Sequence, residues 1–326
     1  MTKSAFAPSM IYTPQEIQSI VEYAHDRGVE VIFEVDVPGH AAGWALGKPE
    51  IMADCMQKYT NINNYALDVS MEETYVTLGN ILRDIVTSSG AKGSSRLHIG
   101  GDEVVYGCWS NDADIVAFMA KQGYTSYAQL FNYFIGRADN IVAGLNKTAI
   151  HWEEVFTSGC SVSHDNIFQV RSFSLDCAAV VQRISYPTCI NHVLLNSFLS
   201  FSLNFHFFLI FSQVWTDSSI VSQITAADYK VIASPSNYWY LNIASNTWQV
   251  AYSYNPTANL TSTAQRNNVV GGEVALWGEF VDDQNIIRSV FSVHVWSQLL
   301  TLNISDWLSF CRYPQQFSCT VLRSTW

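Results

Sequence analysis

Two neighbouring carboxylates, Asp102 and Glu103, follow a short apolar run and two glycines in HIGGDEVVYGCW, residues 98–109. The apolar run is typical of a buried strand, and the glycines mark the place where the strand ends. Because successive side chains at a strand end point in different directions, the two acids can reach different atoms of one ligand. We also expect the charge on Asp102 to raise the pKa of Glu103 and so to favour a protonated acid near neutral pH.

Other polar and aromatic clusters occur at the ends of apolar segments. They are Asp36 with His40; Trp152 with Glu153 and Glu154; Trp215 with Asp217; Trp239 with Tyr240 and Asn242; and Trp277 with Glu279. Carboxylates and indoles dominate, and the sequence has neither a Ser or Cys nucleophile elbow nor an HExxH motif. This combination is typical of glycoside cleavage, which needs a proton donor and a group that stabilises an oxocarbenium-like centre.

The segments that carry these clusters alternate between strand and helix patterns. Strands are expected over residues 29–40, 95–104, 147–156, 230–242 and 269–283, and helices over 13–28, 71–90, 126–146 and 217–229. The expected strands are apolar throughout, as in a parallel sheet that is buried on both faces. In an α/β fold of the (β/α)₈ TIM-barrel type, the carboxyl ends of the strands converge on one site, which accounts for the recurring clusters. A doubly wound sheet is disfavoured because the sequence has no GxGxxG motif.

Composition excludes several classes of function. The chain has 326 residues, about the size of one large α/β domain, and a formal net charge of −11. An acidic protein is a poor partner for nucleic acid or for an anionic membrane face. The seven cysteines form no CxxC pair, so we expect no zinc site, and neither a metal nor an organic cofactor is implied. Ten Trp and sixteen Tyr residues instead suit the binding of sugar rings.

Six motifs resemble, in their order along the chain, the signatures of the family 20 β-N-acetylhexosaminidases. They are FEVDVPGHAAGW, RLHIGGDEVVYGCW, HWEEVF, VWTD, YWYLN and GGEVALWGEFVD, and the resemblance covers about residues 10–169 and 214–288. It implies that terminal β-linked N-acetylglucosamine or N-acetylgalactosamine is removed by a substrate-assisted retaining mechanism. In that mechanism the 2-acetamido oxygen of the substrate attacks the anomeric carbon and forms an oxazolinium-type intermediate.

The resemblance also implies a role for individual residues. Glu103 matches the general acid/base, Asp102 the residue that orients the acetamide, and Tyr240 the donor to the acetamide oxygen. The other matches to substrate-binding positions are Asp36, His40, Trp152, Trp215, Trp239, Asn242, Trp277 and Glu279. Cys55 and Cys108 match a family disulfide that flanks the acid loop.

Two parts of the chain depart from the family pattern. The first two strands have no counterpart, so we expect an incomplete barrel with about six of eight β/α units. The catalytic domain is predicted over residues 1–169 and 214–288, with an insertion at 170–213 and a tail outside the pattern at 289–326. Without the insertion the text reads NIFQVWTDSS, an uninterrupted strand.

Two interpretations of the insertion stay open. Its two ends can be encoded by the ends of an intron, which suggests a translated intron. Alternatively, residues 193–211 are long and apolar enough for a transmembrane helix, although Asn196, Asn204 and His206 lie inside this stretch.

An incomplete barrel is expected to leave two parallel strand edges unpaired, and hence to give little or no turnover. The alternatives to an active enzyme are an inactive truncated fragment and a sugar-binding protein without turnover. The expected partners are oligosaccharides or glycoconjugates that end in N-acetylhexosamine. The family suggests a homodimer, and a membrane is involved only if residues 193–211 span it. A lysosomal or secreted location is implied by the resemblance, although the chain opens without a signal-peptide pattern.

Overall fold

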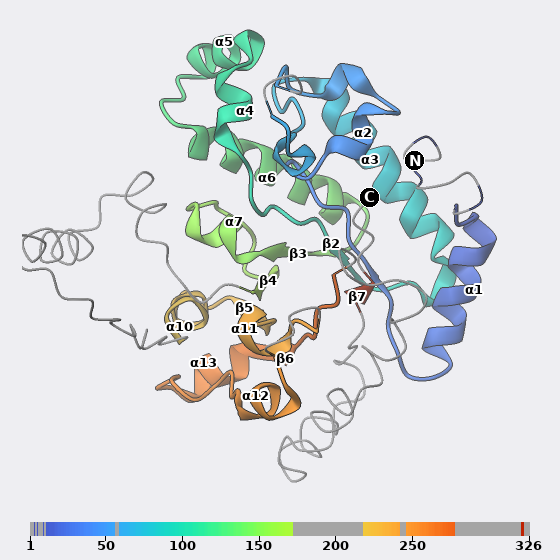
Figure 1. Cartoon of the computed structure of the whole chain (residues 1–326), viewed down its shortest axis with the longest axis vertical. Coiled ribbons are helices and arrows are strands. Elements are labelled where there is room, and N and C mark those ends of the chain that lie inside the picture. Colours follow the sequence, from blue (N-terminus) through green and yellow to red (C-terminus); the bar gives the residue numbers. More distant parts are fainter. Residues whose placement is uncertain are drawn as a thin grey trace, which may run out of the picture.

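The protein is described by a computed structural model, in which helices lie outside a parallel sheet (Figure 1). The structure describes residues 3, 5, 9, 11–55, 59–171, 218–241, 246–277 and 321–322. Most of the predicted insertion and most of the predicted tail therefore lie outside the described residues, and so does the apolar stretch 193–211. In the part of the chain that is described, no helix has both the length and the apolar character needed to cross a membrane.

Five strands form a parallel sheet in sequence order. They are β2 (Arg96–His98), β3 (Thr148–Trp152), β4 (Ile167–Val170), β5 (Lys230–Ala233) and β6 (Val269–Gly272). A further strand, β1 (Ile32–Phe33), runs beside β2, where the Val35 N–H donates to the carbonyl oxygen of His98 at 2.8 Å. Sequential parallel strands with helical crossovers are the arrangement of an incomplete (β/α) barrel, as the sequence predicted.

A short strand from the tail covers one sheet edge that was expected to be unpaired. β7 (Val321–Leu322) pairs in parallel with β1, with Ile32 opposite Val321 and Phe33 opposite Leu322. The expectation that both edges would be unpaired is therefore wrong for β1. Although the tail has no family pattern, its apolar residues supply backbone groups that pair with this edge.

Four helices occupy the predicted positions, and their bounds follow from local signals. They are α1 (Pro14–His25), α3 (Glu72–Ser88), α6 (Tyr127–Gly144) and α10 (Ser218–Ala226). A capping box formed by Thr13 and Glu16 begins α1, and Ser126 with Gln129 does the same for α6. The shorter helices are α2 (Ala42–Ala45), α4 (Tyr106–Ser110), α5 (Ala113–Gln122), α7 (Glu153–Thr157), α11 (Ser236–Trp239), α12 (Trp248–Ser253) and α13 (Thr263–Asn268).

The strands are shorter than the sequence predicted, because the polar clusters lie in the turns that follow them. β3 ends at Trp152, and α7 begins at the next residue. The strand expected over 230–242 ends at Ala233, since Pro235 starts the short helix α11 instead. A proline has no N–H to donate to a sheet, so the strand stops before it. The polar ends of the predicted segments are thus free to form a site.

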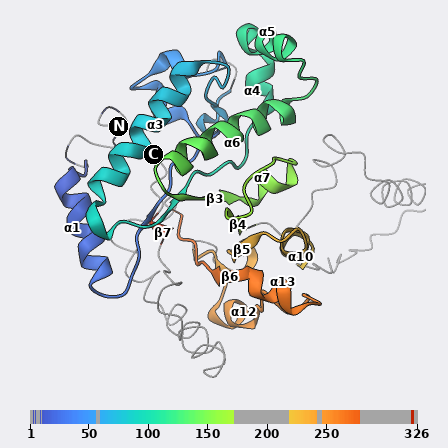
Figure 2. The same ribbon diagram turned by 180° about the vertical axis from the view of Figure 1, so that it is seen from behind.

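The core lies between the sheet and the helices α3 and α6, which run alongside each other (Figure 2). Leu78 and Leu82 of α3 and Phe134 of α6 are fully buried, and the Phe134 ring lies 5.9 Å from the ring of Tyr75. Below the acid loop, the indole N–H of Trp109 donates to the Leu67 carbonyl oxygen at 3.0 Å, so this buried polar group is satisfied. One continuous apolar core therefore fixes α3 and α6 beneath the loop that carries Asp102 and Glu103.

We expect Leu78→Ala to lower the free energy of unfolding by about 2–5 kcal/mol, because it removes a fully buried side chain and leaves a cavity. On the same helix, Val76 is 47% exposed. We expect Val76→Ala to change the free energy of unfolding by no more than about 0.5 kcal/mol. Urea denaturation of the two variants measures the difference, and equal losses would show that α3 does not pack by the face seen here.

Candidate active site

A tight glycine turn carries the two acids out of β2. Gly100 and Gly101 both have positive φ, 66° and 96°. A Cβ on Gly100 would collide with the carboxylate of Asp36, and one on Gly101 would lie 2.5 Å from Cγ2 of Val155. The Gly101 N–H donates to Oδ1 of Asp36 at 3.2 Å. Only glycine fits this turn, and the Asp36 side chain holds it against the segment that follows β1.

The turn gives the two acids different surroundings. The Asp102 side chain is fully buried, whereas that of Glu103 is 59% exposed. Glu103 has a φ of 52°, in the left-handed region that a residue with a Cβ seldom adopts. The two acids thus differ in exposure, and their contact with different atoms of one ligand stays a prediction. The Asp102 carboxylate is therefore shielded from water, and the Glu103 carboxylate is accessible to it.

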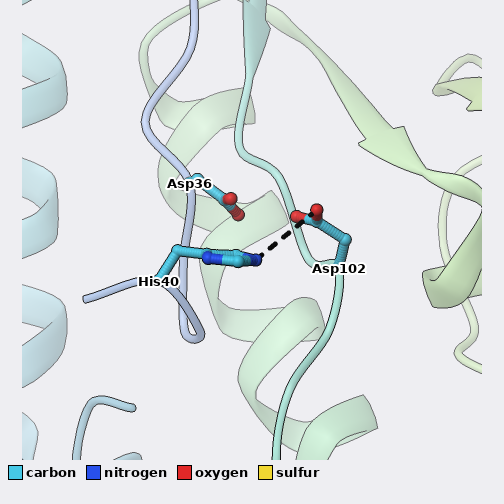
Figure 3. A group of neighbouring side chains, drawn as sticks. All are labelled: Asp36, His40 and Asp102. Atoms are coloured by element: carbon cyan, nitrogen blue, oxygen red, sulfur yellow. Dashed lines mark ion pairs between the residues drawn. The ribbon is translucent and has the colours of Figure 1, made fainter. Parts of the chain in front are cut away.

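His40 lies beside Asp36 and Asp102 (Figure 3), and it also approaches Glu103. Its Nε2 atom is 3.4 Å from Oε2 of Glu103 and 3.7 Å from Oδ2 of Asp102. Asp36, His40 and Asp102 each present one potential ligand atom, and these atoms lie within 4.8 Å of one another. Such a group can hold a cation, but the Asp102 charge is already matched by an arginine, and we assign no metal here.

That arginine is Arg171, which lies in the predicted insertion and was not among the predicted site residues. It follows β4 directly, and its Nη1 atom lies 2.7 Å from Oδ2 of Asp102. Its Nη2 atom lies 3.2 Å from Oε1 of Glu103 and 2.7 Å from Oε1 of Glu154. The backbone N–H of Arg171 also donates to Oε2 of Glu153 at 3.1 Å. The one feature of the sequence that could have indicated a site residue here is the position of Arg171 directly after a buried apolar strand.

Two further carboxylates belong to this cluster. Glu153 and Glu154 begin α7, and Glu153 is fully buried. Burial raises the pKa of Glu153 well above its usual value, and the neighbouring charge of Glu154 adds to the effect. Burial also raises the pKa of Glu154, against the attraction of Arg171. Protonation of these acids relieves a cluster of four carboxylates around Arg171, of which three contact its guanidinium and Glu153 accepts from its backbone N–H.

The pKa of Glu103 is shifted in the direction opposite to our expectation. A hydrogen bond from His40 lowers this pKa, and the charge of Arg171 adds to the lowering. Burial and the charge of Asp102 raise it, but they are outweighed. The prediction that Asp102 keeps Glu103 protonated is therefore wrong for this arrangement. The pKa of Glu103 is lowered because two donors, His40 and Arg171, face its carboxylate.

Aromatic side chains form a wall beside the acids. The ring centres of Trp152 and Trp277 are 6.2 Å apart, and those of Tyr240 and Trp277 are 5.5 Å apart. The indole N–H of Trp152 donates to Oε1 of Glu34 at 3.1 Å, which fixes the plane of the ring. Burial raises the pKa of Tyr240, so its hydroxyl remains a hydrogen-bond donor. The structure thus brings together three of the predicted aromatic residues.

Other predicted site residues lie elsewhere. The indole N–H of Trp239 donates to the Ala251 carbonyl oxygen at 3.0 Å, in a separate apolar cluster with Ala233 and Tyr254. This position gives Trp239 a packing contact, so its predicted contact with substrate stays a prediction. The predicted residues Trp215, Asn242 and Glu279 lie outside the described residues.

Cysteine pairing near the site follows the resemblance. Cys55 and Cys108 form a disulfide. It joins α4, which follows the loop of Asp102 and Glu103, to the segment between β1 and α3. Cys160 is a buried free thiol, and burial raises its pKa to about 12, so it is an inert packing residue.

An incomplete parallel barrel with adjacent acids beside an aromatic wall is the arrangement that the resemblance to glycoside hydrolases predicts. A family model described as "Glycosyl hydrolase family 20, catalytic domain" matches residues 2–179 and 207–298. The chain belongs to this family. The gap in the match, at residues 180–206, falls within the predicted insertion, whose bounds stay a prediction.

Named relatives agree with this membership. The chain is 28% identical over 317 residues to β-hexosaminidase subunit A1 of Dictyostelium discoideum, with 94% of this chain and 49% of that protein covered. It is 30% identical over 331 residues to β-hexosaminidase subunit alpha of Rattus norvegicus, with 98% of this chain and 54% of that protein covered. The chain therefore spans about half the length of these curated relatives.

Solved structures share the fold. A chitobiase from Flavobacterium johnsoniae superimposes with a TM-score of 0.68 at 20% identity, covering 94% of this chain and 42% of that one. A family 20 exo-β-N-acetylglucosaminidase from Vibrio harveyi gives a TM-score of 0.67 at 21% identity, covering 93% and 44%. At this identity the likeness supports the barrel fold.

We expect Gly100→Ala to destabilise the fold by about 2 kcal/mol or more, because it adds a strained positive φ to a collision with Asp36. Gly136, inside α6, is the matched control, since a Cβ there meets nothing within 4 Å. We expect Gly136→Ala to be neutral or stabilising by up to about 1 kcal/mol. Thermal unfolding of both variants measures the difference. Equal melting temperatures would refute the inference that only glycine fits at position 100.

We expect His40→Ala to raise the pKa of Glu103, because it removes the largest cause of the lowering. Since the pKa is lower in the folded chain, ionised Glu103 adds stability above the ordinary pKa of a glutamate, and this contribution disappears as the pH falls. Carbon-13 NMR of labelled carboxyl groups measures the titration. The exposed His25 provides a control, because His25→Ala should leave the Glu103 titration unchanged.

Proposed function

We propose that this chain carries the active site of a β-N-acetylhexosaminidase, which removes terminal β-linked N-acetylglucosamine or N-acetylgalactosamine. The observation that carries the proposal is a buried carboxylate, Asp102, directly beside an exposed one, Glu103, next to an aromatic wall. Membership of family 20 favours the enzyme over an inactive fragment, and β7 pairs with one of the two strand edges whose exposure led us to expect little or no turnover. The proposed substrates are oligosaccharides and glycoconjugates that end in one of these sugars.

In the first step, the 2-acetamido oxygen of the sugar attacks the anomeric carbon, and the glycosidic C–O bond breaks. Glu103 donates its proton to the departing oxygen, which requires the protonated acid. In the second step, Glu103 accepts a proton from water while that water attacks the anomeric carbon, and the oxazolinium ring opens. The sugar leaves with its anomeric configuration retained, and Glu103 has returned to its starting state.

Asp102 acts on the other end of the same sugar. Its buried carboxylate suits the N–H of the acetamide, because a charge in a water-excluded wall interacts strongly with a developing positive charge. The Tyr240 hydroxyl, which stays protonated, is suited to donate to the acetamide oxygen. Trp152 and Trp277 provide apolar surface for the acetamide methyl group and the sugar face.

The setting of the enzyme is proposed from its relatives. These are named as subunits of β-hexosaminidases, which supports assembly, and a homodimer is the assembly we propose. We also propose a lysosomal or secreted location. The Cys55–Cys108 disulfide supports it, because such bonds persist in oxidising compartments.

An aryl β-N-acetylglucosaminide tests the proposed activity. We expect Glu103→Gln to lower kcat/KM by at least about 100-fold, because the amide cannot donate the proton. The corresponding aryl β-glucoside, which lacks the acetamide, should be hydrolysed at no measurable rate. A sugar-binding protein without turnover is the second candidate. It would bind N-acetylglucosamine equally well with Glu103 or Gln and release no aryl alcohol, which would refute the proposed enzyme.

A further inference from the structure

Arg171 stands where the family pattern predicts an indole. If residues 170–213 are left out, the strand reads NIFQVWTDSS, and Trp215 takes the position directly after the last residue of β4. In the structure β4 runs from Ile167 to Val170, and Arg171 occupies that position. The register of β4 is fixed by its neighbours, since Gln169 pairs with Trp152 of β3 and with Ile232 of β5. Arg171 therefore cannot move along the strand without breaking this pairing.

The guanidinium of Arg171 lies against the residues that the proposed mechanism assigns to the sugar. Its central carbon is 5.0 Å from the centre of the Trp152 ring, where a sugar face would stack. Only 13% of the Arg171 side chain is exposed, so the group is enclosed by the site. It also contacts carboxylate oxygens of both Asp102 and Glu103, at 2.7 Å and 3.2 Å.

These contacts compete with the first proposed step of catalysis. A carboxylate that binds a guanidinium at 2.7 Å is a poorer acceptor for the acetamide N–H. A glutamate that faces a guanidinium is ionised, whereas the first step needs it protonated. In the proposed mechanism, the sugar and Arg171 therefore need the same two carboxylates and the same indole, Trp152.

We propose that Arg171 is a built-in occupant of the sugar position, which a substrate must displace before Asp102 and Glu103 can act. This inference rests on the proposed function. It makes Arg171 a positioning residue that determines how tightly the site binds an uncharged N-acetylhexosamine.

The surrounding charges hold Arg171 in place. The acid loop supplies Asp102 and Glu103, and α7 supplies Glu153 and Glu154. The segment after β1 supplies Asp36 and His40, and Tyr240 faces the cluster from the turn after α11. One cation among these acids is strongly favoured, because its removal leaves several buried carboxylates without a counter-charge.

Calorimetric titration of the full chain with N-acetylglucosamine tests the proposal. We expect Arg171→Gln to bind the sugar at least tenfold more tightly than the unmodified chain. We expect the same of Arg171→Trp, which restores an indole at this position. Carbon-13 NMR should show a higher pKa for Glu103 in both variants. Arg96→Gln is the matched control, because Arg96 pairs with Glu30 at the other end of β2, at 3.0 Å, and its loss should not change sugar binding.

A double variant, Arg171→Gln with Glu154→Gln, removes one positive and one negative charge together. It keeps the test informative if Arg171→Gln fails to fold, and we expect the same tighter binding. Unchanged or weaker binding in the folded Arg171 variants would overturn the inference. If hydrolysis still depends on Glu103 in that case, the proposed function stands by itself. If no variant binds the sugar or cleaves the aryl glycoside, both are overturned.

Discussion

One guanidinium among four carboxylates is the interaction on which the whole site depends. Asp102 and Glu103 follow β2, whereas Glu153 and Glu154 begin α7 directly after β3. Because β2 and β3 pair in parallel, their carboxyl ends bring the two acid pairs together. In a partly buried cluster of like charges, protonation or a counter-ion is required. Arg171 is that counter-ion, and its position one residue past β4 follows from the same pairing. The electrostatic balance of the site is therefore a consequence of strand register.

The backbone at the end of β2 imposes a second constraint. A helix or an extended strand would place two successive side chains by its regular repeat. The turn at Gly100 and Gly101 instead uses positive φ values and places backbone against Asp36, where a Cβ has no room, so that one acid is buried and the next is exposed. The strain that remains, at Glu103, is offset by hydrogen bonds and by the packed core below the turn. The backbone geometry of this turn therefore requires the two glycines that precede the two acids.

Local features could be predicted from the sequence, and long-range ones could not. The acid pair, the indoles and the capped helices depend on neighbouring residues, and these were recognised. The strand ends were placed too late, because an apolar run gives no sign of where pairing stops until a proline or helix start intervenes. The pairing of β7 with β1 and the role of Arg171 depend on segments far apart in the chain. Nothing in the local pattern specifies which segment arrives at a given edge.

The charges around Glu103 also bear on the order of events in the proposed reaction. The retaining mechanism needs this residue as an acid first and as a base later, so a fixed low pKa assists the second step and opposes the first. An uncharged sugar that displaces Arg171 removes one of the attractions that lower the pKa, while the charge of Asp102 remains and raises it. Arrival of the substrate would then itself favour protonation of Glu103, at the moment when the departing oxygen requires a proton. On this proposal, protonation of Glu103 and sugar binding are linked through Arg171, and the strength of that link depends on how firmly Asp102 and Glu154 hold its guanidinium.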